Sequence, residues 1–212
     1  MNYPAELVFG AACAAQRINA DYVKGIKWPD VAAPDAKPSN RRLMTKLLAV
    51  DTSDTGDYIS EDDMAQGRDI RKYFQALTFK ILQGKVLSDF DSNALAICNR
   101  DELSTNYELA VACSFPASYL RGKARDTVEN RVKFAAGGFI GQVGDKISIQ
   151  VEVLRTFYSQ QWNTHYVTAI TDEDQALFFS FKEGLDPGIY TIVGTVKSHR
   201  DNQTQLNRVK IK

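Results

Sequence analysis

Few residues in this sequence have the types and spacing that catalysis or metal binding requires. His165 and His199 are the only histidines, and neither has a cysteine close by in the sequence, so a metal site there would lack ligands. Gly138, Gly141 and Gly144 are spaced GxxGxxG, which matches neither the dinucleotide-binding fingerprint nor a phosphate-binding loop. No paired carboxylates, activated serine or thiolate setting stands out. We therefore predict a protein that is not an enzyme and has no metal site and no cofactor.

The acidic cluster and the thiols have ordinary interpretations. The acidic run 172–174 could ligate a hard cation, but acidic residues are common in hairpin turns, so a turn is the favoured interpretation. Cys13, Cys98 and Cys113 are widely spaced, each within an apolar helical pattern. This spacing favours buried free thiols in a reducing compartment over a zinc site.

A set of cations and flat rings in the last third of the chain could bind a nucleic acid. Lysine and arginine neutralise phosphates, and an aromatic ring stacks on an unpaired base for ~1–3 kcal/mol whatever the base. The residues predicted to bind single-stranded nucleic acid are Arg155, Tyr158, Trp162, Phe178, Lys197, His199, Arg200, Arg208 and Lys210. Lys197 and His199 are expected to point outward. For each ring, the competing interpretation is that it fills or covers a barrel.

Five β-like runs must position these side chains. Alternation of apolar and polar residues, with β-branched and aromatic enrichment, predicts strands. The runs are 146–158, 162–171, 176–182, 188–199 and 204–211. Five short antiparallel strands cannot bury two faces of a flat sheet, so we expect them to close into a small barrel. The alternation of the first run falters at Leu154, which indicates a bulge.

The closing runs also carry a resemblance to a known fold. The run 192–199 (IVGTVKSH), followed by Gln203-Thr204 and Arg208-Val209, resembles the closing hairpin of OB-fold modules in bacteriophage and bacterial DNA-handling proteins. The entry segment 141–146 and the turn 172–174 fit the same pattern. The resemblance covers about the last third of the chain and implies an OB-like barrel that binds single-stranded nucleic acid. The sequence departs from the pattern at Gln175, where glycine is frequent, and at 183–187, which is too short for the usual helix.

The first two thirds of the chain have helical periodicity. Apolar spacing predicts helices over 5–24, 60–84, 88–99 and 104–114, and we also assign the ambiguous segment 43–50 to a helix. The prolines of 26–40 indicate an irregular loop. Pro116 is expected to end the last helix. Residues 117–134 then form a basic connector, in which Gly122 weakens any single helix.

These patterns predict an α+β protein with two domains. Residues 1–134 form a mostly helical domain, and residues 135–212 form a five-stranded OB-like β-barrel. The net charge is zero, which excludes a wholly basic coat for nucleic acid. The charge is nevertheless uneven: residues 51–115 carry −6 and residues 188–212 carry +4. Such asymmetry permits a basic groove on a neutral protein.

The function that these features favour is non-catalytic binding of single-stranded DNA in phage-type replication, recombination or repair. The helical region would then dock replication or recombination proteins, or self-associate. The alternative is a protein-interaction or structural adaptor, which binds a protein partner through the barrel and the acidic helical surface. No apolar run approaches the ~18 residues of a membrane span, and no signal-peptide pattern begins the chain. We therefore predict a cytoplasmic protein, in the host cytoplasm if phage-encoded, without a membrane partner.

Overall fold

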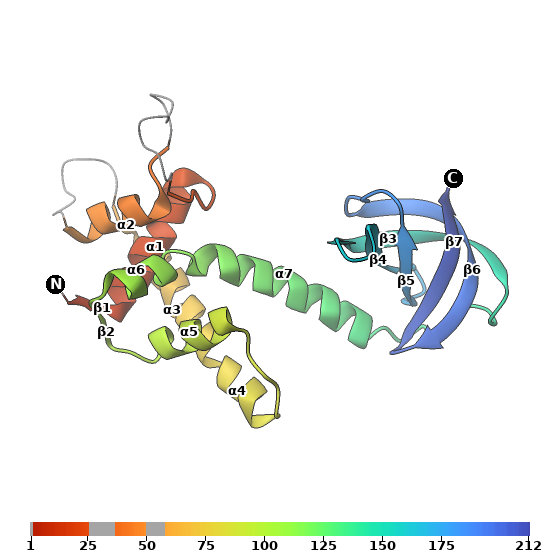
Figure 1. The fold of residues 1–212 in the computed structure, drawn as a ribbon, viewed down its shortest axis with the longest axis horizontal. Coiled ribbons are helices and arrows are strands. Elements are labelled where there is room, and N and C mark those ends of the chain that lie inside the picture. Colours follow the sequence, from red (N-terminus) through yellow and green to blue (C-terminus); the bar gives the residue numbers. More distant parts are fainter. Residues whose placement is uncertain (1, 26–36, 50–57) are drawn as a thin grey trace. The chain divides into compact units, whose positions relative to one another are not determined.

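The computed structural model describes residues 2–25, 37–49 and 58–212. Most of the loop predicted over 26–40 lies outside the described residues. The chain divides into two compact units, Met1–Gly122 and Lys123–Lys212, and each is described by itself. The predicted α+β class is confirmed, because helices form the N-terminal part and a closed five-stranded barrel forms the C-terminal part (Figure 1). The domain boundary at 134/135 stays a prediction.

The described residues of the first unit form helices and one short strand pair (Figure 1). Its elements are β1 Tyr3–Pro4, α1 Ala5–Asn19, α2 Asn40–Ala49, α3 Glu61–Gln75, α4 Leu77–Leu82, α5 Asp89–Cys98, β2 Glu102–Leu103, α6 Asn106–Ala112 and the start of α7 Phe115–Lys133. The ambiguous segment 43–50 is helical over its described part, as predicted. The helix predicted over 60–84 is divided into α3 and α4 at Ala76.

Helix α7 differs from what the sequence suggests. It runs unbroken through Pro116, predicted to end a helix, and through Gly122, predicted to weaken one. Pro116 lies in the first turn, where its missing N–H breaks no intrahelical hydrogen bond. Gly122 faces Tyr73, and a Cβ on it would clash with the Tyr73 hydroxyl. Close packing, rather than flexibility, therefore explains this glycine.

Small residues let α1 and α3 pack closely in the core of the helical unit. A Cβ on Gly67 of α3 would lie 2.9 Å from the backbone nitrogen of Gly10 and 3.0 Å from the carbonyl carbon of Phe9, which is closer than carbon atoms pack. Around this crossing, the ring centroid of Phe115 lies 5.7 Å from that of Phe9 and 4.9 Å from that of Phe74. The alanines that α1 buries are Ala5, Ala11, Ala12, Ala14 and Ala15.

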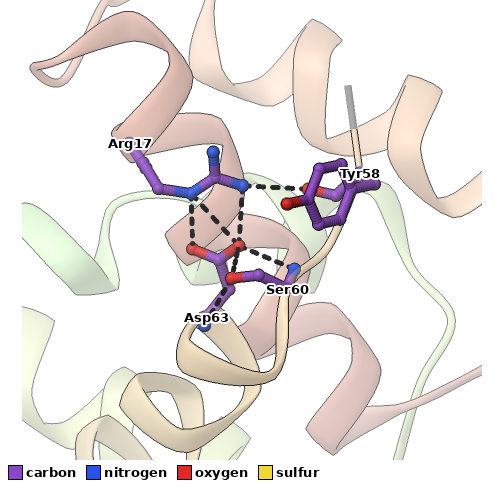
Figure 2. A network of polar contacts seen from close by, with 4 residues as sticks. All are labelled: Arg17, Tyr58, Ser60 and Asp63. Carbon is purple, nitrogen blue, oxygen red and sulfur yellow. Dashed lines mark hydrogen bonds and ion pairs between the residues drawn. The ribbon is translucent and has the colours of Figure 1, made fainter. Parts of the chain in front are cut away.

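An arginine–aspartate pair joins the end of α1 to the start of α3 (Figure 2). Arg17 Nη2 donates to an Asp63 carboxylate oxygen at 2.8 Å and to the Tyr58 carbonyl at 2.9 Å, and Nε donates to the other carboxylate oxygen at 3.1 Å. The Ser60 N–H and hydroxyl also donate to Asp63, at 2.9 and 2.7 Å. The Ser60 hydroxyl in turn accepts from the Asp63 N–H at 3.1 Å, which completes a capping box.

The Asp63 side chain is only 3% exposed, yet it stays ionised at neutral pH. Burial by itself raises the pKa of this carboxyl. The hydrogen bonds from Arg17 and Ser60 and the charge of Arg17 outweigh that effect and hold the pKa below its ordinary value of 3.8. The pair therefore fastens two helices together without leaving a buried carboxylate unpaired.

A second buried carboxylate repeats this arrangement at the start of α6. Glu108 accepts from the N–H groups of Ser104 and Thr105, both at 2.9 Å, and forms an ion pair with Arg100 at 2.6 Å. These backbone hydrogen bonds, helped by the charge of Arg100, lower the pKa of Glu108 from its ordinary value of 4.5. Asp63 and Glu108 are thus each held by a helix cap and an arginine.

The second unit contains a closed barrel of five strands (Figure 1). The strands are β3 Lys146–Ser159, β4 Thr164–Ile170, β5 Ala176–Phe181, β6 Gly188–Arg200 and β7 Gln203–Ile211. Their order is β3-β4-β5-β7-β6, and β6 pairs back to β3. Neighbours are antiparallel except β5 and β7, which are parallel. This topology is compatible with an OB-like fold.

Strand β3 takes part in two walls of the barrel. Its first half pairs with β6 and its second half with β4. The register with β4 shifts between Val153 and Arg155, which confirms the bulge predicted at Leu154. The side chains that fill the barrel are Ile140, Val151, Val153, Val167, Ala169, Leu177, Phe179, Ile192, Val196 and Leu206.

The end of α7 covers part of the outer barrel surface. Val132 packs with Ile170 and Ala176 in a small apolar cluster outside the barrel. Asn202, in the β6–β7 turn, donates through Nδ2 to the carbonyl oxygens of Val132 and Ala135 at 3.2 and 3.0 Å. The Val132 carbonyl also accepts from the Ala135 N–H at 3.4 Å, so Asn202 adds a side-chain donor to the carbonyls at the end of the helix. The last turn of α7 is thereby anchored to the barrel.

In the part of the chain that the structure describes, no helix is both long enough and apolar enough to cross a membrane.

Candidate nucleic-acid interface

The outer wall formed by the second half of β3 with β4 and β5 has a row of aromatic rings. Phe157 of β3 lies opposite Tyr166 of β4, and the Tyr166 ring stacks on that of Phe178 of β5, with centroids 5.5 Å apart and an interplanar angle of 14°. These rings point outward because Val167 and Phe179, their neighbours along the strands, fill the barrel. Phe157 is 61% exposed. We call Phe157, Tyr166 and Phe178 the ring row.

A cation lies next to the ring row. Arg155 is paired across the strands with Thr168, which is in turn paired with Phe178. Arg155 is exposed, and within the described residues no acid forms an ion pair with it. The wall therefore combines flat apolar surface with a positive charge that is free to meet an anion.

Two more rings lie near the turn between β3 and β4: Trp162 in the turn itself, and Tyr158 at the end of β3, on the face opposite to Phe157. Trp162 is 66% exposed. Tyr158 donates its hydroxyl to Asn163 Oδ1 at 2.7 Å, and its ring lies 4.9 Å from that of His165. Asn163 adopts a φ of 45°, a left-handed conformation that asparagine tolerates better than most residues. The turn is thus held by a side-chain hydrogen bond while its tryptophan faces solvent.

A pocket of about 310 Å³ lies between the end of α7 and the barrel. Its lining residues are Val128, Glu129, Val132, Lys133, Arg155, Thr168, Asp201, Asn202 and Gln203. Arg155 belongs both to this pocket and to the wall with the ring row. The charges of the lining balance, since two cations and two acids contribute to it, and Asp201 already pairs with Arg200 at 3.0 Å.

The predicted residues at the end of β6 lie apart from the ring row. The register with β7 shifts between Val196 and Ser198, so exposed Lys197 is the extra residue of a bulge. His199 follows the bulge and differs from its predicted outward position. Its Nδ1 lies 3.3 Å from the Thr204 hydroxyl and its Nε2 lies 3.1 Å from the Gly141 carbonyl oxygen. The His199 ring also stacks on Phe139, with centroids 4.6 Å apart, so this histidine packs the barrel entry.

The last two predicted cations lie on β7. Lys210 is paired with Val193 of β6, which is paired with Ser148 of β3, and it therefore belongs to the β3–β6–β7 wall. Arg208 is exposed and adopts a φ of 52°. Within the described residues, neither cation forms an ion pair. The nine predicted residues thus divide into three groups: the wall and turn that bear the rings, the end of β6, and the closing strand.

Two residues of the ring row are missing from the predicted set. The sequence left open whether Phe157 or Tyr158 faces outward, and it gave no face for Tyr166. The sequence pattern of β4 could have placed Tyr166. Val167 and Ala169 are alternate apolar residues that face the barrel interior, so Tyr166 lies on the outer face. The bulge in β3 hides the same signal for Phe157, since the extra residue reverses the alternation.

The three thiols are buried, and the acidic turn 172–174 has an ordinary structural role. Burial raises the pKa of Cys13 and of Cys98 to about 12 and also raises that of Cys113, so these thiols stay protonated and unreactive at neutral pH. Across the described residues, no group of three or more histidine, cysteine, aspartate or glutamate side chains is placed to hold a metal ion. In the acidic turn, Asp174 accepts from the backbone N–H of Ala136 at 2.9 Å, as turn residues commonly do.

Fold and site together define a protein with a helical unit and a closed five-stranded barrel, compatible with an OB-like fold, that carries exposed rings. Comparisons with protein-family models, with curated proteins and with solved structures found no match to this chain. The likeness to OB-fold modules therefore depends on the residues and the strand topology given above.

Proposed function

We propose that this protein binds single-stranded DNA through the β3–β4–β5 wall of its barrel, without catalysis, in phage-type replication, recombination or repair in the cytoplasm. The observation that supports this most directly is the ring row of Phe157, Tyr166 and Phe178, with Arg155 next to it. Phe157 is exposed, and the half-buried Tyr166 and Phe178 continue the row beside it. An apolar surface of this kind suits a binding partner.

The chemistry of the wall suits an unpaired strand. Every base has a flat face that can stack on an aromatic ring, and each such contact is worth ~1–3 kcal/mol irrespective of sequence. In a duplex these faces are already stacked on one another and are out of reach. Arg155 on the wall and Lys133 at the adjacent pocket can neutralise phosphates along the same strand, with release of counterions. Affinity should therefore depend on both rings and salt.

Fluorescence anisotropy with a labelled oligothymidine and a matched duplex tests the proposal, using the full chain at low salt. Phe157→Ala and Tyr166→Ala should each weaken binding of the single strand by about 5- to 150-fold, the equivalent of one lost stacking contact. Ile189→Ala is the matched control. Ile189 is an equally exposed apolar residue on β6, outside the wall, and its substitution should change the affinity by less than about twofold.

A salt series then distinguishes the two walls of the barrel. Arg155→Gln should reduce the slope of log affinity against log salt by about 1, whereas Lys210→Gln should leave the slope unchanged. The reverse result would assign binding to the β3–β6–β7 wall. Absence of any binding to either oligonucleotide at low salt would overturn the proposal.

The alternative function, a protein-interaction adaptor, remains a competing proposal. Exposed apolar side chains such as Phe157 and Trp162 also suit a protein partner. In that case the ring variants would lose a stoichiometric protein partner whose capture resists nuclease, and the oligonucleotide would not compete for the site.

A further inference from the structure

Helix α4 and the segment after it expose four large apolar side chains. Phe79, Ile81 and Leu82 of α4 and Val86 of the following segment are all exposed; Leu82 is 76% and Val86 97% accessible to solvent. Of the residues of α4, only Leu77 is buried. We call Phe79, Ile81, Leu82 and Val86 the α4 patch; Figure 1 labels helix α4, which carries the first three of them.

The fold of the helical unit does not need the α4 patch. Helix α4 contributes Leu77 to the core of that unit, together with residues of α1, α2, α3, α5, α6, β2 and the start of α7, whereas the four patch residues take no part in it. Leu87, next to Val86, packs against the core and anchors the segment. A protein gains nothing in stability by holding such side chains in water, so a partner surface is the physical reason for their exposure.

The size of the α4 patch favours a second copy of this chain as that partner. The exposed parts of the four side chains amount to roughly 500 Å². Two such patches pressed together would bury on the order of 1,000 Å², which is the lower bound for a specific protein–protein interface. Contact between the α4 patches of two copies removes both patches from water at once.

The charges around the α4 patch point to the same partner. Lys80 and Lys85 lie on one side of Val86 in the sequence, and Asp89, exposed at the start of α5, lies on the other. In a twofold-symmetric interface, each surface must be complementary to itself. A patch that carries both signs satisfies this requirement, because the cations of one copy can face the acid of the other.

We infer that the chain forms a symmetric dimer through the α4 patch, with Lys80 and Lys85 of one copy near Asp89 of the other. The dimer does not depend on the proposed binding of DNA, since the α4 patch lies wholly within the first unit and the ring row within the second.

Sedimentation velocity on the full chain without nucleic acid, over a series of concentrations, tests the inference. The unmodified chain should show a monomer–dimer equilibrium. Val86→Asp and Leu82→Asp should each raise the dimer dissociation constant at least about 100-fold, because a carboxylate would be buried without a partner. Tyr107→Asp, at an exposed position in the first turn of α6, is the control and should leave the equilibrium unchanged.

Charge reversal separates self-pairing from attachment to another protein. Lys85→Glu alone makes the charges of the α4 patch more acidic, and Asp89→Lys alone makes them more basic, so each variant should dimerise about tenfold more weakly. A one-to-one mixture of the two variants should recover a dimer that contains one copy of each. Asp91 is left unchanged, because it forms the helix cap with Ser88.

Far-UV circular dichroism must first show that each variant is folded, which the exposure of these positions leads us to expect. A purely monomeric chain at every concentration would overturn the inference. So would a dimer that Val86→Asp and Leu82→Asp leave intact, or the absence of mixed dimers. None of these outcomes bears on oligonucleotide binding, which is measured separately.

Discussion

The helical unit and the barrel use their charged and aromatic residues in opposite ways. In the helical unit, Asp63 and Glu108 are buried, and each is satisfied by an arginine and by backbone N–H groups. The rings of Phe9, Phe74 and Phe115 lie inside its core. In the barrel, Arg155 and Phe157 face solvent. The same residue types therefore stabilise one unit and are available for binding on the other.

The difference shows where sequence changes should affect stability and where they should affect binding. A buried, fully hydrogen-bonded ion pair leaves a costly unpaired group when one partner is removed. An exposed cation or ring has little to lose on folding, because water surrounds it in both states. Substitutions in the helical network should thus lower the free energy of unfolding, whereas substitutions on the ring-bearing wall should leave it nearly unchanged.

The largest effect is expected at the pair in Figure 2. Asp63→Asn removes the charge that Arg17 binds but keeps the side-chain shape, and it should lower the free energy of unfolding by about 2–3 kcal/mol. The measurement is urea denaturation followed by circular dichroism at 222 nm, where helices dominate the signal. Asp62→Asn, in the same helical turn but exposed, is the control and should cost less than about 1 kcal/mol. Equal losses for the two variants would contradict the comparison.

A pH series should show the next largest effect. The folded-state pKa values of Asp63 and Glu108 are held below their ordinary values of 3.8 and 4.5. The unfolded chain therefore binds more protons, and stability falls as the pH drops from about 5 through these lowered values. The urea midpoint should decline in that window and decline less steeply in Asp63→Asn. If the urea midpoint declined equally with pH in the unmodified chain and in Asp63→Asn, the Asp63 carboxylate would not be the cause of the acid sensitivity.

The smallest effect is expected at the ion pair between α7 and the barrel. Arg131 donates both terminal nitrogens to the Glu152 carboxylate at 2.9 and 2.8 Å, but both side chains are about half exposed. Arg131→Gln should therefore reduce stability by less than about 1 kcal/mol. Hydrogen exchange followed by mass spectrometry can measure this on peptides from β3. A loss greater than that of Asp63→Asn would reverse the comparison between the units.

Much of the fold could be predicted from the sequence, because most helices and strands are indicated by local signals such as capping residues and apolar alternation. Ser60, followed by acids in the first turn, predicts the start of α3, where the structure has a full capping box. Leu177 and Phe179 alternate with Phe178 without interruption, so the faces of β5 could be assigned correctly. The faltering pattern at Leu154 likewise indicated the bulge in β3.

Other features depend on contacts that no local pattern encodes. Gly122 lowers helix propensity by itself, but Tyr73, far away in sequence, fills the space beside it. The bulge at Lys197 interrupts no apolar repeat, and it reverses the face of His199 without any change in composition. For the same reason, the predicted cations of the closing strand could not be separated from those of the wall that bears the rings. Their grouping follows from strand pairing, which only the folded chain reveals.

The hydrogen bonds from Asn202 to the end of α7 determine where a fragment must begin if the barrel is to be grafted into another protein. Val132, near the end of α7, packs over Ile170 and Ala176. Asn202 in the β6–β7 turn binds the carbonyls of Val132 and Ala135 at the same helix end. A graft beginning at residue 135 would expose Ile170 and Ala176 where Val132 covers them, and it would remove the Val132 carbonyl, one of the two acceptors of Asn202. The portable module is therefore the barrel together with the closing turns of the helix that precedes it.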